Sequence, residues 1–404
     1  MAFTFNSPVK IVFGEGCADQ VGQELVGLGA KKVLVVTGPG HRHEEQDHAG
    51  SAQAGHEGNG HEGAFETVVA ALKKAGLEYV RFAGAGADPT PAMVEEGACV
   101  FKEARSDAIL ALGGGSPMDC AKAIGASVGE GRPFADFVGT GRVLAAPLPP
   151  LVAVPTTAGT GSEVSGTSVL TIEKDGHKMK LGTSGATLFP KAAFVDPLLH
   201  VSMPPALTAA TGMDALTHAI ECYVGRQHTP LADLYCIEAM RLIGLSLRRA
   251  CQRCDDLEAR GNMALAATCA GVALSNASLG MVHGFAHALG ALCGMAHGTA
   301  NAIMLPYVMA GCVDDAAERL ALAGAALTGT SSIDAHASVA ALFSLDHDIG
   351  IPRSLAEAGV PESMLNSIYE DAKNYKRRPM SPHLFTDEEL WQVLYSAWSG
   401  TETT

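Results

Sequence analysis

The sequence has no uninterrupted apolar run of about 18 residues, so we expect no membrane-spanning segment. Charged residues make up only 18% of the chain, and basic ones are outnumbered, with 28 Lys and Arg against 43 Asp and Glu. Nucleic-acid binding needs a basic patch that neutralises phosphates, and a net charge of -15 therefore predicts no nucleic-acid partner. The opening residues, MAFTFNSPVKIVFG, lack a basic start followed by an apolar block, and so predict no secretory signal.

The ten cysteines lack the spacing of a disulfide framework. Cys251 and Cys254 form one CxxC pair, but a zinc knuckle would need a second pair. In a chain of this length such scattered cysteines are typical of reduced thiols in a reducing compartment, so we expect the protein in the cytoplasm.

The length of 404 residues, 47% of them apolar, predicts two domains, each with its own core. In the first half, short β-branched runs alternate with helical patterns such as residues 64–76 and 91–104, which favours a parallel α/β domain. The expected strands lie at residues 31–38, 79–84, 107–115 and 151–157.

After residues 203–207 the composition changes, and the chain continues in long segments rich in Ala, Leu and Met, which predict an all-α domain. We therefore expect an α/β domain over residues 1–202 and a helical domain over 203–404. One segment of the first domain, residues 38–63, is glycine-rich, polar and holds five of the fifteen histidines. Because it cannot bury an apolar face, it predicts a flexible surface loop, although histidine-rich tracts can also bind metal.

Two loops rich in small residues follow expected strands. LGGGSPMDCAKA, residues 112–123, places three glycines before an expected helix that Ser116 could cap, with Pro117 in the first turn. Glycines let a ligand approach the backbone, and helix-start amides attract phosphate oxygens. PTTAGTGSEVS, residues 155–165, adds hydroxyls at the next strand end. Together they predict a ligand site at the carboxyl edge of a parallel sheet.

Five residues with metal-binding side chains lie in the helical half. Asp214 and His218 are four residues apart, as are His283 and His287, so each pair can share a helix face. His297 follows a glycine-containing segment that could turn the chain back. A carboxylate with imidazoles suits a divalent first-row metal such as iron or zinc. Spacing alone leaves open which of the last three histidines bind it.

These motifs, with MPPALTAATGMDALTHAIE and GMVHGFAHALGALCGMAHGTANAIMLP, resemble the iron-dependent (group III) alcohol dehydrogenase family almost from end to end. The resemblance implies an N-terminal Rossmann-like α/β domain and an all-α C-terminal domain, a dehydroquinate synthase-like architecture. It also implies hydride transfer between a primary alcohol, or its aldehyde, and NAD or NADP, with Fe²⁺ or Zn²⁺ polarising the oxygen.

Carried over by motif, the resemblance implies a role for each of several side chains. The metal ligands would be Asp214, His218, His283 and His297, with His287 beside the substrate as a proton relay. The dinucleotide would lie along Gly113, Gly114, Gly115, Ser116, Asp119, Thr156, Thr157, Thr160 and Lys180, with Lys178 as an alternative to Lys180. Gly38 takes the place where NAD-preferring relatives carry an aspartate, which leaves NADP open.

Other readings remain. A glycerol-type or hydroxy-acid dehydrogenase of the same superfamily, or a non-enzymatic metal-binding protein that uses the histidine-rich segment, would share some of these features. The basic run Lys376, Arg377 and Arg378 suggests attraction of an anionic substrate, against the simpler reading of a solvated loop. We also expect a homo-oligomer, a dimer or larger.

Overall fold

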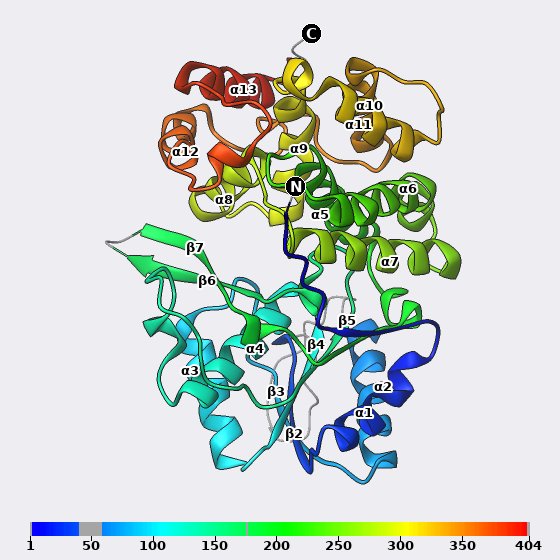
Figure 1. Ribbon diagram of the computed structural model, residues 1–404, viewed down its shortest axis with the longest axis vertical. Coiled ribbons are helices and arrows are strands. Elements are labelled where there is room, and N and C mark those ends of the chain that lie inside the picture. The colour runs from blue at the N-terminus through cyan, green and yellow to red at the C-terminus, as the bar shows by residue number, and fades with distance from the viewer. Residues whose placement is uncertain (1, 40–58, 175–176, 402–404) are drawn as a thin grey trace, which may run out of the picture. The chain divides into compact units, whose positions relative to one another are not determined.

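The computed structural model describes residues 2–39, 59–174 and 177–401, and it divides into two compact units, each described by itself (Figure 1). The α/β unit comprises Pro8–Thr157 and Ser162–Met203. The helical unit comprises Met1–Ser7, Ala158–Gly161 and Pro204–Thr404. The main division thus falls between Met203 and Pro204, whereas two short segments assigned to the first domain group with the helices instead.

Local contacts explain both exceptions. The backbone N–H of Asn6 donates to the Asn276 side chain at 2.5 Å, and Asn276 Nδ2 donates back to the Asn6 carbonyl at 2.9 Å. In the second segment, a Cβ on Gly161 would lie 2.4 Å from the Gly271 Cα atom, so this loop lies directly against a helix of the helical unit.

The α/β unit contains a six-stranded sheet in which every neighbouring pair is parallel. The strand order is β1-β8-β5-β4-β2-β3. The strands are β1 (Lys10–Phe13), β2 (Lys32–Val36), β3 (Glu78–Phe82), β4 (Ala108–Gly113), β5 (Leu151–Pro155) and β8 (Ala192–Val195). The order reverses between β2 and β4, and ligands of open parallel sheets bind at such switch points, outside the carboxyl ends of the strands.

Helices cover both faces of this sheet (Figure 1). They are α1 (Val21–Gly27), α2 (Asn59–Lys74), α3 (Pro91–Glu103) and α4 (Gly115–Glu130). Successive strand residues point to opposite faces, so Val33 and Val35 pack with α1 and α2, whereas Leu34 and Val36 pack with α3 and α4. Burial on both faces explains the near-continuous apolar strand sequences, and the predicted α/β class is confirmed.

Two features of this unit differ from the expectations. An antiparallel hairpin of β6 (Thr167–Lys174) and β7 (His177–Ser184) was not predicted, nor were β1 and β8. The loop predicted over residues 38–63 was placed with its end too far along the chain, because residues 59–63 belong to α2. Most of that segment, including four of its five histidines, lies outside the described residues.

The helical unit consists of the remaining helices, and the predicted all-α class of this region is confirmed. They are α5 (Pro205–Val224), α6 (Pro230–Gln252), α7 (Leu257–Leu274), α8 (Met281–Cys293), α9 (His297–Ala310), α10 (Val313–Thr328), α11 (Ala335–Asp348), α12 (Leu365–Ala372) and α13 (Asp387–Ser399). No helix in the described part of the chain is long and apolar enough to span a membrane.

Glycines allow the central helices of this unit to approach very closely. A Cβ on Gly298, in the first turn of α9, would lie 2.2 Å from the Ala210 carbonyl oxygen of α5. A Cβ on Gly212 would lie 2.4 Å from the Leu247 side chain of α6. At Gly212 the flexible Leu247 side chain could shift, but at Gly298 the neighbouring atoms are backbone. The spacing of α5 and α9 therefore depends on glycine at position 298.

Candidate active site

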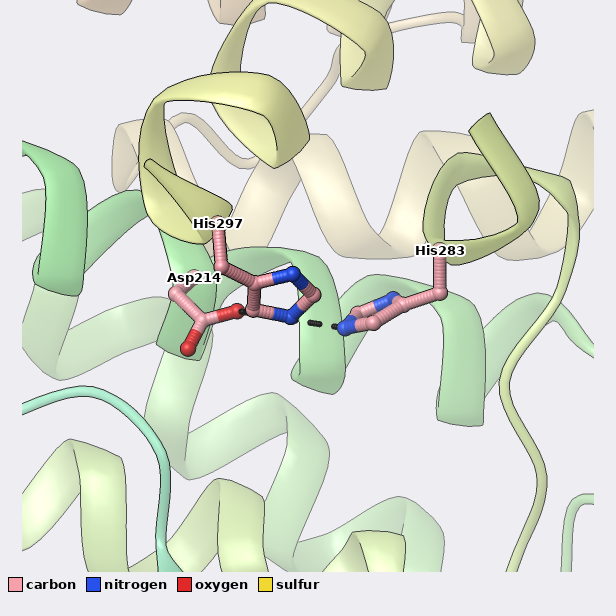
Figure 2. A group of neighbouring side chains, drawn as sticks. All are labelled: Asp214, His283 and His297. Atoms are coloured by element: carbon pink, nitrogen blue, oxygen red, sulfur yellow. Dashed lines mark ion pairs between the residues drawn. The ribbon is translucent and has the colours of Figure 1, made fainter. Parts of the chain in front are cut away.

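Three side chains from three different helices of the helical unit meet at one point (Figure 2). Asp214 comes from α5, His283 from α8 and His297 from the first position of α9, and one donor atom of each lies within 4.8 Å of the others. Asp214 Oδ1 is 3.8 Å from His283 Nε2 and 3.6 Å from His297 Nε2. This is the separation at which several ligands of one small cation stand.

The local sequence explains why His297 returns to the group. Helix α8 ends at Cys293 and is capped by Gly294, whose φ of 67° lies in the left-handed region that glycine favours and that stops the helix. Helix α9 then starts at His297 itself. The predicted glycine-containing turn is therefore present.

His218, the remaining predicted ligand, also faces this group. One turn after Asp214 on α5, its Nε2 lies 3.7 Å from Asp214 Oδ1, and its ring stacks on that of His283 with centroids 4.8 Å apart. Its Nδ1 is buried without a hydrogen-bond partner among the described residues. The structure thus brings all four predicted ligands together.

The electrostatics of the group suit a metal. Burial, reinforced by His218, lowers the pKa of His283 well below its ordinary value, so this imidazole is neutral at neutral pH. Burial opposes ionisation of Asp214, but the three neighbouring histidines and a hydrogen bond from Asn301 hold its pKa below the usual value. A neutral imidazole and an ionised carboxylate are the protonation states that bind metals. The donor set fits Fe²⁺ or Zn²⁺.

Sequence reasoning missed two residues of this site. Asn301, fully buried on α9, donates through Nδ2 to Asp214 Oδ1 at 2.7 Å, and the same nitrogen lies 3.2 Å from Nε2 of both His283 and His297. Glu221, buried on α5, accepts from His283 Nδ1 at 2.6 Å. Burial raises the pKa of Glu221 to about 7, against the backbone N–H groups that hydrogen-bond to it. The signal available for Glu221 was its position on the same face of α5 as Asp214 and His218.

His287 lies beside the ligand group rather than within it. Its ring stacks on His297 at a centroid distance of 5.6 Å and meets the edge of Tyr375 at 5.5 Å. The ring is partly exposed, unlike that of His283. This position, one helical turn from His283, suits a group that exchanges protons near a substrate.

In the α/β unit, the strand ends bring most of the predicted dinucleotide residues together. Gly113 of β4 pairs with Pro155 of β5, and the Thr156 N–H donates to the Gly113 carbonyl at 3.0 Å. A Cβ on Gly114 would lie 3.1 Å from Thr157 Oγ1, and one on Gly38 would lie 3.9 Å from Pro117. The loops after β2, β4 and β5 therefore lie side by side, and we call this glycine-rich group of loops the cradle.

The start of α4 differs slightly from the expectation. The helix begins at Gly115, with Gly114 as its N-cap, so Ser116 does not cap it and Pro117 stands at the third helical position. No side chain caps this helix start among the described residues, and its free amides suit a phosphate. The Thr156 hydroxyl, nearby at the end of β5, is buried without a partner among the described residues.

Both carboxylate oxygens of Asp119 accept hydrogen bonds from groups of the protein itself. One oxygen accepts from Ser162 Oγ at 2.6 Å and the other from the Val169 N–H at 3.0 Å. Beside it the fully buried Lys122 donates to Ser162 and Thr167, and burial lowers its pKa to about 8. Asp119 therefore fastens the segment after β5 to α4, which is a positioning role.

The other predicted cofactor residues have different surroundings. Lys180, on β7, forms an ion pair with Asp88 at 2.6 Å. The side chain of Lys178 lies outside the described part of the structure. Thr160 belongs to a segment that groups with the helical unit, whereas Thr156 and Thr157 belong to the α/β unit.

The basic run after α12 divides into two kinds of residue. Arg378 is tied down by the carbonyl oxygens of Phe385 and Lys373 and by the Asp387 carboxylate. Its assignment to an anionic substrate was therefore wrong. Arg377 is exposed, and its guanidinium forms no hydrogen bond or ion pair within the described ranges.

Comparison with known proteins places the chain. A model described as iron-containing alcohol dehydrogenase matches residues 8–197, and one for the C-terminal part of the Fe-containing alcohol dehydrogenase family matches residues 208–398. The chain therefore belongs to the iron-containing alcohol dehydrogenase family, as predicted. Its class is accordingly that of an NAD-dependent oxidoreductase of alcohols and aldehydes that uses a divalent metal.

Individual relatives cover nearly the whole chain. It is 37% identical to the 1,3-propanediol dehydrogenase of Klebsiella pneumoniae over 98% of this chain and 99% of that one. It is 36% identical to the NAD-dependent methanol dehydrogenase of Bacillus methanolicus, over 97% and 99% of the two chains. The crystal structure of a 1,3-propanediol oxidoreductase superposes with a TM-score of 0.89 at 35% identity, over 98% of this chain and 100% of that one.

Proposed function

We propose that the protein oxidises a small primary alcohol, or reduces the corresponding aldehyde, at a metal held by Asp214, His218, His283 and His297. The observation that carries this proposal is the convergence of these four side chains from three helices, with Asp214, His218 and His283 buried and His297 partly exposed. When bound, the metal supplies Lewis-acid polarisation of the substrate oxygen, and the nicotinamide accepts or supplies the hydride.

The residues of the chain have distinct tasks in this proposal. The cradle formed by Gly38, the Gly113–Gly115 turn and the Thr156–Thr157 pair holds the dinucleotide, with the phosphates at the start of α4. Asp119 holds the second loop in place. His287, partly exposed and next to His297, carries the proton between substrate and solvent through its ring nitrogens.

The residue that bears on the choice between NAD and NADP is Gly38, shortly after the end of β2. Gly38 offers no carboxylate to the adenosine ribose, and equally no repulsion against a 2′-phosphate. We propose that the protein accepts both NAD and NADP.

We propose further that the protein is a homo-oligomer. Strand β1 is an edge of the sheet, pairing with β8 alone among the described residues, and its Ile11 and Phe13 are 39% and 43% exposed. An unpaired edge strand with apolar side chains is a template for a second chain. Light scattering should give a dimer or larger assembly, and a monomer at micromolar concentration would contradict it.

The cysteines support a reducing location. All ten are free thiols, including Cys251 and Cys254 of the CxxC pair. We therefore propose that the protein works in the cytoplasm.

The decisive test is anaerobic turnover of chelated protein resupplied with Fe²⁺ or Zn²⁺, with NAD⁺ and NADP⁺ and a panel of primary alcohols. We expect turnover to disappear on chelation and to return with one of the metals. Metal binding without turnover of any alcohol or aldehyde would contradict the proposed function. Preferential turnover of glycerol or a hydroxy acid would move the substrate to the alternative class.

A further inference from the structure

Glu221 is buried beside the four proposed ligands, yet it is not one of them. It follows His218 by three residues and Asp214 by seven on α5, so all three side chains leave the same face of that helix. Its side chain is 2% exposed. A carboxylate this buried is costly unless both of its oxygens are hydrogen-bonded.

One oxygen of Glu221 faces a ligand. Oε2 lies 2.6 Å from His283 Nδ1, and an ionised carboxylate can only accept here, so Nδ1 carries the hydrogen when Glu221 is ionised. The other ring nitrogen, Nε2, then keeps its lone pair. This is the nitrogen that lies 3.8 Å from Asp214 Oδ1. The contact therefore selects the tautomer of His283 that can bind a cation at the centre of the group.

The other oxygen fixes the helix that carries this histidine. Oε1 accepts from the Val282 N–H at 2.8 Å, in the first turn of α8. The N-cap residue of α8, Gly280, has no side chain to satisfy these amides, and Ser381 Oγ accepts from the preceding N–H of Met281. A Cβ on Gly280 would lie 3.0 Å from Oε1, so glycine leaves Glu221 the room to reach the helix.

We propose that Glu221 is a positioning residue that holds His283 in the tautomer and orientation needed to bind the metal. The two oxygens act as one clamp, since one sets the start of α8 and the other sets the ring three residues into that helix. This inference rests on the metal-dependent function proposed above, and it adds a residue outside the predicted ligand set.

Glu221→Gln is the discriminating variant because glutamine has the same shape but only one acceptor oxygen. If that oxygen takes the Val282 N–H, the amide group faces His283 Nδ1 and donates to it. The histidine must then carry its hydrogen on Nε2, where the metal would bind. Glu221→Asp keeps two acceptor oxygens on a shorter side chain and should retain part of the binding.

Glu389→Gln is a matched control at the start of α13. Glu389 likewise accepts from a backbone N–H at a helix start, that of Thr386, and contacts a histidine, His383, at 3.2 Å. It is not part of the ligand group, so the same substitution tests the loss of a capping carboxylate alone.

The experiment measures Co²⁺ binding to each full-length metal-free protein, by chelator competition and by the visible absorption spectrum of the bound ion. For Glu221→Gln we expect Co²⁺ affinity to fall about 10–100-fold, with an altered spectrum, while Glu389→Gln binds as wild type. Glu221→Asp should fall between the two. The unfolding midpoints of the metal-free proteins complete the comparison.

Two results would overturn the inference. One is wild-type affinity and spectrum in both Glu221 variants. The other is weaker binding that merely follows a lower unfolding midpoint, because a structural role alone would produce it. If Glu221→Gln does not fold, the same criteria apply to Glu221→Asp. Failure of the wild-type protein to bind Co²⁺, Fe²⁺ or Zn²⁺ would instead contradict the proposed function itself.

Discussion

In the α/β unit, the polar groups at the strand ends are backbone amides beside glycines, which carry no side chain, and the hydroxyls of the buried Thr156 and the partly exposed Thr157. In the helical unit, the offered groups are carboxylate and imidazole side chains, held by further buried side chains such as Glu221 and Asn301. A dinucleotide presents many weak acceptors along its length, and the backbone can meet them one by one. A metal ion needs a few strong donors at one point, and here side chains from three helices supply them.

This contrast implies that substitutions in the two regions should affect different steps of the reaction. Substitution in the helical site should abolish chemistry by removing a donor, whereas substitution in the glycine cradle should weaken cofactor binding by filling space.

The largest effect is expected for the ligands. Asp214→Ala or His283→Ala should remove bound metal and lower kcat/KM by about 1,000-fold or more, because Lewis-acid polarisation lowers the activation free energy by several kcal/mol. Metal content by elemental analysis and steady-state kinetics measure this. His228→Ala, which removes a partly exposed histidine paired with Asp233, is the control and should retain metal. Full activity in either ligand variant would contradict the assignment.

A smaller effect is expected at the cradle. Gly113 has a φ of 141° and its Cβ would lie 2.9 Å from Pro117, so Gly113→Ala should strain the turn by about 1–3 kcal/mol. We expect KM for the dinucleotide to rise about 10-fold while Co²⁺ affinity stays unchanged. Gly131→Ala, at the other end of α4, also has a positive φ but open space around it. It should lower stability without changing this KM. Equal effects of the two variants on KM would argue against the cradle.

Cofactor preference provides the third test. A Cβ on Gly38 meets nothing closer than 3.6 Å, so the backbone position has room for a Cβ. Gly38→Asp should favour NAD over NADP by about 10-fold in kcat/KM, because the carboxylate accepts from ribose hydroxyls and repels a 2′-phosphate. An unchanged ratio would mean that the adenosine end lies elsewhere.

The smallest effect concerns the unpaired Arg377. Arg377→Ala should raise KM for a hydroxy-acid substrate about 2–5-fold and leave KM for a neutral alcohol unchanged, the size expected of one exposed charge. Arg253→Ala, at another exposed arginine, is the control. A similar change for both substrates would show that Arg377 does not act through its charge.

The sequence predicted the proximity of the proposed ligands because these residues follow helical spacing. Asp214 with His218, and the glycine turn before His297, are local patterns that a helix and its C-cap translate directly into geometry. The expected strands also matched the observed ones within a few residues, since apolar runs buried on both faces are conspicuous. The spacing alone left open whether His283 or His287 binds the metal, and the family resemblance implies that it is His283.

The remaining features depend on contacts between distant residues. Glu221 reaches His283 across 62 positions, and Asn301 reaches Asp214 across 87, so neither pairing appears in any local pattern. Arg378 looked like a free cation until its carbonyl partners, seven and five residues away, were placed. The β6–β7 hairpin does have a local signal in the sequence, the Asp-Gly pair at positions 175–176.

The close approach at Gly298 bears on how the metal preference of this protein could be altered. Exchanging a ligand changes the chemical character of the donors, whereas moving α9 away from α5 would change the separation of Asp214 and His297. The two helices can stand this close because Gly298, the neighbour of His297, has no Cβ atom to meet the Ala210 carbonyl oxygen. Selection for a larger ion would therefore be expected to yield mutations at such helix-contact glycines, while the ligands themselves stay the same.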